Sequence, residues 1–145
     1  MQFPETAEDV EQEILVSSHK YRELGDLRIR QLIHLLPKVN SEIVVEGVIR
    51  VFEKGGGADT YCQDQEFAGK VLESINPKTQ KDSVEVLQRV LKNWDKSVEQ
   101  FPFWLRDNYG IDTLKKTFVE LELTEIEKDK LKTIKWWLHL NEASA

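Results

Sequence analysis

Signals that begin and end helices recur at short intervals along this chain, and they constrain its fold more than any other feature. Residue types that cap helix N-termini precede apolar stripes of helical spacing at Thr6, Asp26, Ser41, Asp82, Asp112 and Thr124. Glycine or proline ends several of the predicted helices, at Gly25, Pro37, Pro77 and Gly110. The sequence therefore predicts an all-α fold of about eight helices packed as antiparallel pairs.

No linker or low-complexity segment divides the chain, so we expect one domain over residues 1–145. A chain of this length buries roughly 70% of its unfolded surface, which is enough for a single core. Within the domain we expect an acidic N-terminal helix at 6–24, helix pairs over 26–122 and a last helix over 124–141.

Residues 41–54 are the segment whose secondary structure the local pattern leaves open. The segment alternates in the way that is typical of a strand, at Ile43, Val45, Gly47, Ile49 and Val51. It also fits one face of a helix, at Val44, Val45, Val48, Ile49 and Phe52. Gly47 in the middle of a helix would cost about 1 kcal/mol relative to alanine. A helical segment would therefore imply that another helix packs closely against Gly47.

An internal similarity resolves this segment. A shift of 39 residues aligns it with 82–95, whose pattern is plainly helical. The aligned residues include Glu46 with Glu85 and Arg50 with Arg89. The Pro-Lys step at 37–38 recurs at 77–78, one residue late. We therefore predict helices at both 41–54 and 82–95.

This arrangement resembles the HEAT-like and armadillo-like α-helical repeats over about residues 26–122. The resemblance implies a right-handed stack of helix pairs, in which the second helices line a concave surface that binds a partner. A generic orthogonal bundle of helices would give much of the same pattern. Both architectures therefore stay open at this point.

The net charge of −6 belongs mostly to one end of the chain. Residues 1–13 hold five of the 26 acids and no base, so the remainder has a net charge of −1. Residues 20–38 form a local basic region with a net charge of +3. Strong nucleic-acid binding needs a wider basic footprint, so we expect a solvated face or a contact for the acidic N-terminus. Nucleic-acid binding through 20–38 is a third, weaker hypothesis.

Signatures of catalysis or metal binding are scarce. The one cysteine, Cys62, has no base near it in the sequence, and the three histidines lie in different predicted elements. We expect no catalytic residue, no metal and no cofactor. The alternative hypothesis is an enzyme or ligand-binding bundle whose site is assembled from separated helices. Its candidate residues are Cys62, His34, Glu46 and Glu66.

Aromatic residues crowd into 94–109, where we expect most of them to form core. One face of the last helix carries Ile126, Leu131, Ile134, Trp137 and Leu138. Trp136 and Leu140 point to the other side. A helix that is apolar on two sides lies between two layers or presents a patch to a partner. Trp136 and Leu140 are thus candidates for protein binding, for self-association, or for burial beneath the N-terminal helix.

The function that we infer from the sequence is a small, non-enzymatic protein–protein interaction module. Its expected partner-binding residues are the repeated ion pairs and the C-terminal patch, namely Glu46, Arg50, Glu85, Arg89, Trp136 and Leu140. No apolar run approaches the ~20 residues that span a bilayer, and the N-terminus lacks a secretory signal pattern. We therefore expect a cytoplasmic protein that binds another protein and no membrane.

Overall fold

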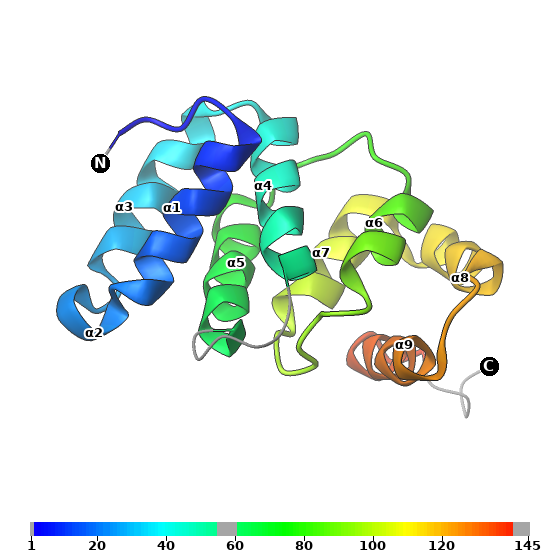
Figure 1. Cartoon of the computed structure of the whole chain (residues 1–145). Coiled ribbons are helices and arrows are strands. Elements are labelled where there is room, and N and C mark those ends of the chain that lie inside the picture. The colour runs from blue at the N-terminus through cyan, green and yellow to red at the C-terminus, as the bar shows by residue number, and fades with distance from the viewer. Residues whose placement is uncertain (1, 55–60, 141–145) are drawn as a thin grey trace.

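The computed structural model describes residues 2–54 and 61–140 (Figure 1). These two ranges contain nine α-helices, one 3₁₀ turn and no strand, which confirms the all-α prediction. The elements are α1 (Ala7–His19), α2 (Tyr21–Leu24), α3 (Leu27–Leu35), the 3₁₀ turn η1 (Leu36–Lys38), α4 (Ser41–Lys54), α5 (Tyr61–Ile75), α6 (Ser83–Val90), α7 (Gln100–Tyr109), α8 (Ile111–Glu120) and α9 (Glu125–Trp137).

Helix starts agree best with the prediction where a side chain caps them. At α1 the Thr6 hydroxyl accepts a hydrogen bond from the Asp9 amide, and the Asp9 carboxylate accepts one from the Thr6 amide, both at 3.1 Å. Thr124 and Glu127 form the same reciprocal capping box at α9. The helix predicted at 41–54 is α4, with the same bounds.

The first and last helices are shorter than predicted. The segment expected as one helix over 6–24 breaks after His19, and α2 is a separate turn. The chain reverses here so that α3 can contact α1, and Gly25 adopts a φ of 58° that suits glycine. The last helix ends at Trp137, and its expected end at residue 141 lies outside the described residues.

The helix predicted at 82–95 is also too long, because α6 ends at Val90. The side chain of Gln65, which is completely buried, binds the segment beyond this point. Its amide nitrogen donates to the Asn93 carbonyl and its amide oxygen accepts from the Asp95 backbone, both at 2.7 Å. A buried amide needs such partners, and a continuing helix would have kept these backbone groups for its own hydrogen bonds.

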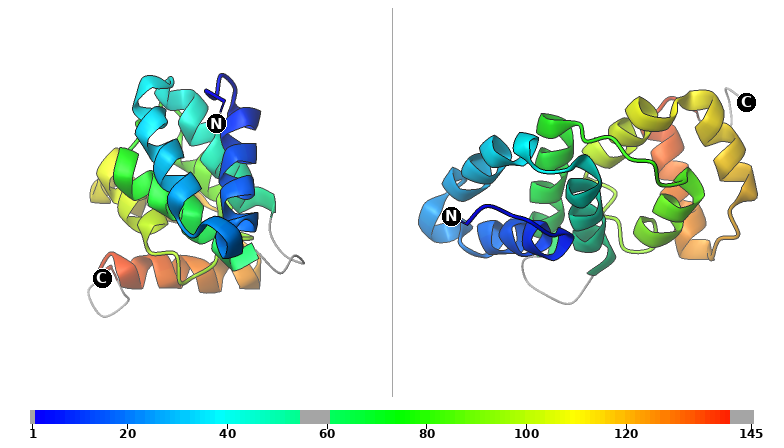
Figure 2. Two further views of the ribbon diagram at one scale, coloured as in Figure 1. Left: turned by 90° about the vertical axis from the view of Figure 1, so that its left-hand side faces the viewer. Right: turned by 90° about the horizontal axis from the view of Figure 1, so that it is seen from above.

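The helices from α3 to α8 lie in two rows (Figure 2). α3, α5 and α7 follow one another in the first row, and α4, α6 and α8 in the second, with contacts between neighbours in each row. At one end α1 packs on α3, α4 and α5. At the other end α9 contacts α7 and lies beneath the C-terminal half (Figure 1). The molecule is therefore elongated along the rows.

The close approach that Gly47 implied is confirmed. A Cβ atom at Gly47 would lie 2.6 Å from the Val10 Cβ and 2.9 Å from the Ala7 carbonyl oxygen of α1. Both distances are shorter than Cβ contacts in folded proteins allow, so only glycine lets α1 lie directly on α4. Val10 and Ile14 of α1 are completely buried.

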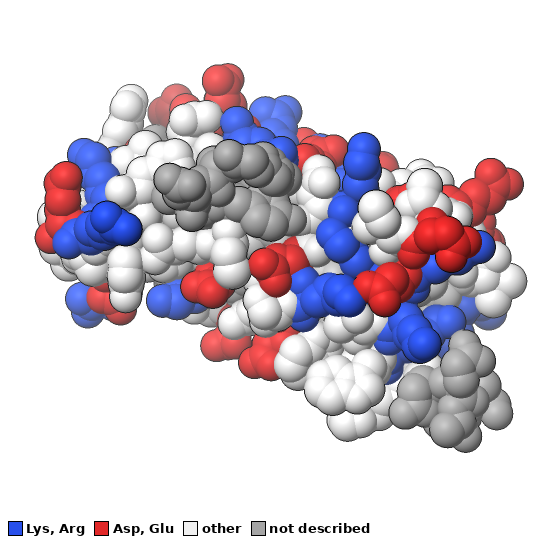
Figure 3. Space-filling view, turned by 60° about the horizontal axis from the view of Figure 1, so that its bottom comes forward, with Lys and Arg blue, Asp and Glu red and all other residues white. Residues whose placement is uncertain are grey.

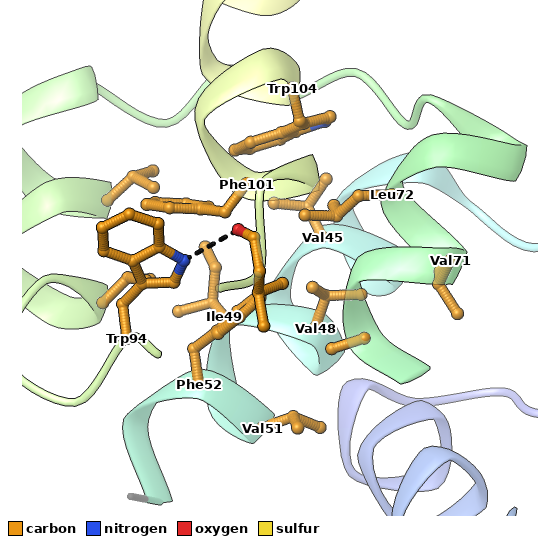
Figure 4. Packing of buried hydrophobic residues seen from close by; sticks show 14 of the residues in the cluster. Val45, Val48, Ile49, Val51, Phe52, Val71, Leu72, Trp94, Phe101 and Trp104 are labelled. Carbon is orange, nitrogen blue, oxygen red and sulfur yellow. Dashed lines mark hydrogen bonds between the residues drawn. The ribbon is translucent and has the colours of Figure 1, made fainter. Parts of the chain in front are cut away.

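One core joins the two halves of the molecule (Figure 4). Its labelled members are Val45, Val48, Ile49, Val51 and Phe52 of α4, Val71 and Leu72 of α5, Trp94, and Phe101 and Trp104 of α7. The Trp94 indole donates to the Val98 carbonyl at 3.0 Å, so this ring is buried with its polar group satisfied. Phe103 and Tyr109 are only partly buried, so the predicted aromatic core holds for most of its members.

Candidate functional site

The predicted ion pairs meet between α4 and α6. The guanidinium of Arg89 on α6 lies 2.7 and 2.8 Å from the two carboxylate oxygens of Glu46, and 2.6 Å from Glu53 of α4. Lys81 lies 3.2 Å from Glu46, and Arg50 donates to the same carboxylate at 3.0 Å. We call these five side chains the α4–α6 seam.

The electrostatics of the α4–α6 seam favour the charged forms of its central groups. Hydrogen bonds from Arg89 lower the pKa of Glu46 to about 2, from its usual 4.5, although partial burial opposes this shift. Hydrogen bonds to Glu46 and Glu53 raise the pKa of the Arg89 guanidinium further above its usual value. The seam is thus an ion-pair network in which α4 and α6 neutralise each other.

Glu85, the remaining member of the repeated pairs, lies at the edge of the seam. Its carboxylate is 3.8 Å from Arg89 and 3.9 Å from Lys81, and half of its side chain is exposed. That Glu46, Arg50, Glu85 and Arg89 bind a partner stays a prediction. Three of these four side chains make close contacts with one another, and a partner that used them would have to displace those contacts.

The basic region at 20–38 is partly neutralised within the molecule. Arg28 lies 2.9 Å from Glu13 of the acidic N-terminal helix, and Arg30 lies 3.1 Å from Asp26. The pair of Arg28 with Glu13 joins the basic region to the acidic N-terminal segment, which is one of the two arrangements expected from the sequence. On the face drawn in Figure 3, acidic and basic side chains alternate among the residues that the structure describes.

The four residues of the alternative, assembled site are not brought together. The Cys62 sulfur lies 3.6 Å from Glu66, one turn along α5, and both residues are exposed. His34 lines a separate hollow beside Leu27 on α3, and Glu46 is held in the α4–α6 seam. Burial and neighbouring carboxylates raise the pKa of the Cys62 thiol to about 11, which disfavours the thiolate that a nucleophile needs.

Helix α9 exposes one half of the predicted C-terminal patch. Trp136 is 59% exposed, which excludes its burial beneath the N-terminal helix. Leu140, by contrast, packs partly buried against the core. Ile126 shares the predicted apolar face with Leu131 and Ile134 but is 66% exposed, because the buried side of α9 begins only at Leu131.

Trp136 belongs to a continuous series of ring contacts that we call the α9 ledge, formed by Trp136, Trp137 and Phe103. Trp136 and Trp137 meet edge to face with their ring centroids 4.8 Å apart, and Trp137 meets Phe103 of α7 in the same way at 6.1 Å. The Trp137 indole also donates to the Lys96 carbonyl at 3.1 Å. The exposed Trp136 therefore stands on a fixed aromatic support that reaches α7.

Beside Phe103, a hollow opens between the C-terminal end of α5 and α7, and we call it the α5–α7 groove. It has a volume of about 270 Å³. Phe103 lines this groove and also belongs to the α9 ledge, so the two surfaces are continuous. Pockets for small ligands range from about 300 to 1,000 Å³, so a hollow of this size suits a single large side chain.

The floor of the α5–α7 groove is apolar and fixed. Leu72 and Trp104 form its buried part, and the Trp104 ring stacks on Phe101 with centroids 6.3 Å apart (Figure 4). The Trp104 indole donates to the Pro77 carbonyl at 2.8 Å. Asn76, which ends α5 with a φ of 46°, directly precedes this proline. Because the ring and the adjacent turn are held together, the groove is preformed.

The rim of the groove carries polar side chains that the molecule itself does not use. Glu73, Asn76 and Gln100 make no side-chain hydrogen bond or ion pair with any other residue that the structure describes. Arg106 and Asp107 pair with each other at 3.3 Å. Among the residues of 2–54 and 61–140, the carboxylate of Glu73 is therefore the charge of the groove that has no partner.

Neither metal ligands nor a membrane span emerge from the described part of the chain. Within 2–54 and 61–140, no three His, Cys, Asp or Glu side chains gather as metal ligands would, and no helix is both long and apolar enough to cross a membrane. Comparisons with family models, curated proteins and solved structures give no significant match. The function therefore has to be argued from the surface of the molecule itself.

The sequence interpretation missed the α5–α7 groove, because its polar residues come from two helices and form no motif. One usable signal was present in Gly69, a second glycine inside a helix. A Cβ atom there would lie 2.9 Å from the Gln100 side-chain oxygen, so Gly69 marks the close approach of α7. The turn at Asn76 and Pro77, which was predicted, places the end of α5 at the same point.

Proposed function

We propose that this protein is a protein–protein interaction module that binds its partner through the α9 ledge and the adjoining α5–α7 groove. The observation that carries the proposal is the exposure of Trp136 on the ledge. Exposure of a large aromatic side chain to water is unfavourable, and tryptophan is a favoured anchor of interfaces. Support from Trp137 and Phe103 reduces the conformational entropy that binding would cost.

The pairing of charges favours the ledge and the groove as the binding surface. It disfavours the surface of the second helices, which the sequence predicted. In the α4–α6 seam, Glu46 and Arg89 already bind each other. Replacing such a pair with contacts to a partner gains little net free energy, because the desolvated charges must first lose their present partners. In the groove, Glu73 has no such partner to lose among the described residues.

The two rows of helices support a relation to HEAT-like helix pairs. The row of α3, α5 and α7 would supply the first helices of three pairs, and the row of α4, α6 and α8 the second helices; of these pairs α7 and α8 pack on each other, whereas α4 packs mainly on α1 and α5. Arg50 and Arg89 align at the shift of 39 residues, and both donate to the carboxylate of Glu46. In this interpretation the seam is a ladder that joins consecutive second helices.

Affinity capture from a lysate of the source cells tests the proposed function. Wild type, Trp136→Ala and Val119→Ala are compared, because Val119 on α8 is also exposed and apolar. Loss of an anchoring tryptophan costs 2 kcal/mol or more, so we expect Trp136→Ala to weaken the partner's binding by about thirtyfold. Val119→Ala should retain the partner.

Equal capture by wild type and Trp136→Ala would contradict the proposed function, as would the absence of any captured partner together with a wild-type protein that is monomeric. Sedimentation of the purified proteins tests whether the partner at the ledge is a second copy of this chain. A dimer that Trp136→Ala abolishes would support the ledge as an interface and would identify the partner as a second copy of the chain.

A further inference from the structure

The α5–α7 groove has a chemistry that selects what it binds. Building on the proposed function, we propose that this groove receives an arginine side chain of the partner protein. Four properties of the described residues lead to this occupant: the sign of the unpaired charge, the hydrogen-bond acceptors on the rim, the aromatic floor and the size of the hollow.

The unpaired charge requires a cation. Arg106 and Asp107 neutralise each other at 3.3 Å, which leaves the carboxylate of Glu73 as the net charge of the lining. Glu73 has no ion pair with any residue in the described ranges. A basic side chain would therefore gain a charge-assisted hydrogen bond without displacing an existing one.

The rim favours arginine over lysine. The side-chain oxygens of Asn76 and Gln100 are acceptors, and the structure shows neither residue's side chain bonded to another described residue. With Glu73 they offer acceptors from both sides of the groove, since Gln100 belongs to α7 and the others border α5. A guanidinium has five donors in a planar fork, whereas an ammonium is a compact point charge with three.

The aromatic floor also suits a guanidinium. Arg106 already lies over the Phe103 ring, with its guanidinium carbon 5.1 Å from the ring centroid. This contact is favourable by electrostatics and shows how a guanidinium packs on an aromatic ring in this part of the molecule, where Arg106 itself occupies that face of Phe103. Because a guanidinium is weakly hydrated, an arginine loses less than a lysine when it enters such a hollow.

The size and position of the groove fit one side chain on a longer segment. A volume of about 270 Å³ accommodates one large side chain, and the partner's backbone would then lie along the rim. Phe103 is shared with the α9 ledge, so a segment that places arginine in the groove can place an apolar residue against Trp136. The groove would then add charge selectivity to an apolar anchor.

Titration of the full chain with two blocked pentapeptides tests this inference. The probes are acetyl-Gly-Leu-Arg-Leu-Gly-amide and its citrulline analogue, which keeps the shape of arginine and removes the charge. Binding is followed by NMR through the indole N–H of Trp104 and the side-chain amides of Asn76 and Gln100. We expect the arginine peptide to shift these signals and to bind about tenfold more tightly than the citrulline peptide, since one charge-assisted hydrogen bond is worth about that factor.

Variants of the rim residues distinguish recognition of the arginine charge from non-specific binding. Glu73→Gln should weaken the arginine peptide by about tenfold and remove the difference between the two peptides. Glu73→Lys should reverse the preference, so that the same peptide with glutamate in place of arginine binds better. Glu120→Gln, which changes an exposed acid on α8, is the matched control and should leave both affinities unchanged.

Equal binding of the arginine and citrulline peptides, or shifts that leave out Trp104, Asn76 and Gln100, would overturn the inference. An unchanged arginine affinity in Glu73→Gln would overturn it as well. These failures are distinct from a failure of the proposed function. A partner captured through Trp136 but indifferent to Glu73 would leave the interaction module intact and remove only the arginine site.

Discussion

The α4–α6 seam and the α5–α7 groove both lie between consecutive helices of a row, and both contain glutamate and arginine. In the seam, Glu46 contacts three cations of its own chain. In the groove, Glu73 contacts none within the described residues. The most regular charge pattern of this sequence therefore holds helices together. The binding site that we propose lies instead where polar groups have no partner among the described residues, over an aromatic floor.

The two helical glycines show the same contrast in steric terms. At Gly47 the obstacle to a side chain is the Val10 Cβ and the Ala7 carbonyl, which move only with the backbone of α1. At Gly69 the nearest atoms belong to side chains, the end of Gln100 at 2.9 Å, which can rotate away, and the buried Val98 Cγ1 at 3.0 Å, which must shift by a few tenths of an ångström. The contact of α1 with α4 is thus limited by atoms that move only with the backbone, whereas at Gly69 only side-chain atoms obstruct.

The largest effect should come from Gly47→Ala. Overpacking typically costs about 1–3 kcal/mol, and the obstructing atoms at this site place the substitution near 3 kcal/mol. This exceeds the ~1 kcal/mol that alanine contributes through helix propensity. Urea unfolding measures the change. Gly69→Ala is the matched control and should change stability by less than about 1 kcal/mol. Equal costs at both glycines would remove the steric distinction between the two contacts.

A smaller loss is expected from Arg89→Met in the α4–α6 seam. The variant removes hydrogen bonds to two carboxylates, and a bond to a charged group contributes about 1.5–3 kcal/mol, so we expect a loss of about 2 kcal/mol. Acid provides an independent readout. The pKa of Glu46 is lowered from 4.5 to about 2, so its contribution to stability is complete above the higher value and is lost as the pH falls toward the lower one.

Unfolding measured across this acid range should therefore separate the two proteins. Wild type should lose stability between about pH 4.5 and pH 2, and Arg89→Met should lose less in that window, because the largest cause of the lowered pKa is absent. Parallel acid curves for the two proteins would show that the Arg89 contacts add nothing to folding.

Local signals were enough to predict the all-α fold, and the reasons are visible at particular residues. Thr6 and Thr124 cap helices with partners three residues away, so their sequence neighbourhood contains the whole interaction. The end of α6 was not predictable in this way. It depends on Gln65, which lies 30 residues from Asp95 and accepts the backbone amide hydrogen that a helix continuing to residue 95 would donate to the Leu91 carbonyl.

The candidate site was only partly predictable. Trp136 was predicted as a candidate because the last helix carries apolar residues on two opposite sides. In the structure its side chain is exposed. The ion pairs were found from their spacing, but the spacing does not tell whether Arg89 contacts a partner or Glu46. Glu73 and Gln100 lacked any signal in the sequence, because what distinguishes them is that their side chains bond to no other residue that the structure describes.

One matched pair of substitutions tests the central contrast most directly. Glu46→Gln and Glu73→Gln make the same chemical change in the seam and in the groove, and each is measured by urea unfolding and by titration with the arginine peptide. Glu46→Gln should lose about 1–2 kcal/mol of stability and keep its peptide affinity, whereas Glu73→Gln should stay within about 0.5 kcal/mol of wild type and lose about tenfold in affinity. A stable Glu46→Gln protein that no longer binds the peptide, or a Glu73→Gln protein that is destabilised and still binds it, would contradict the account.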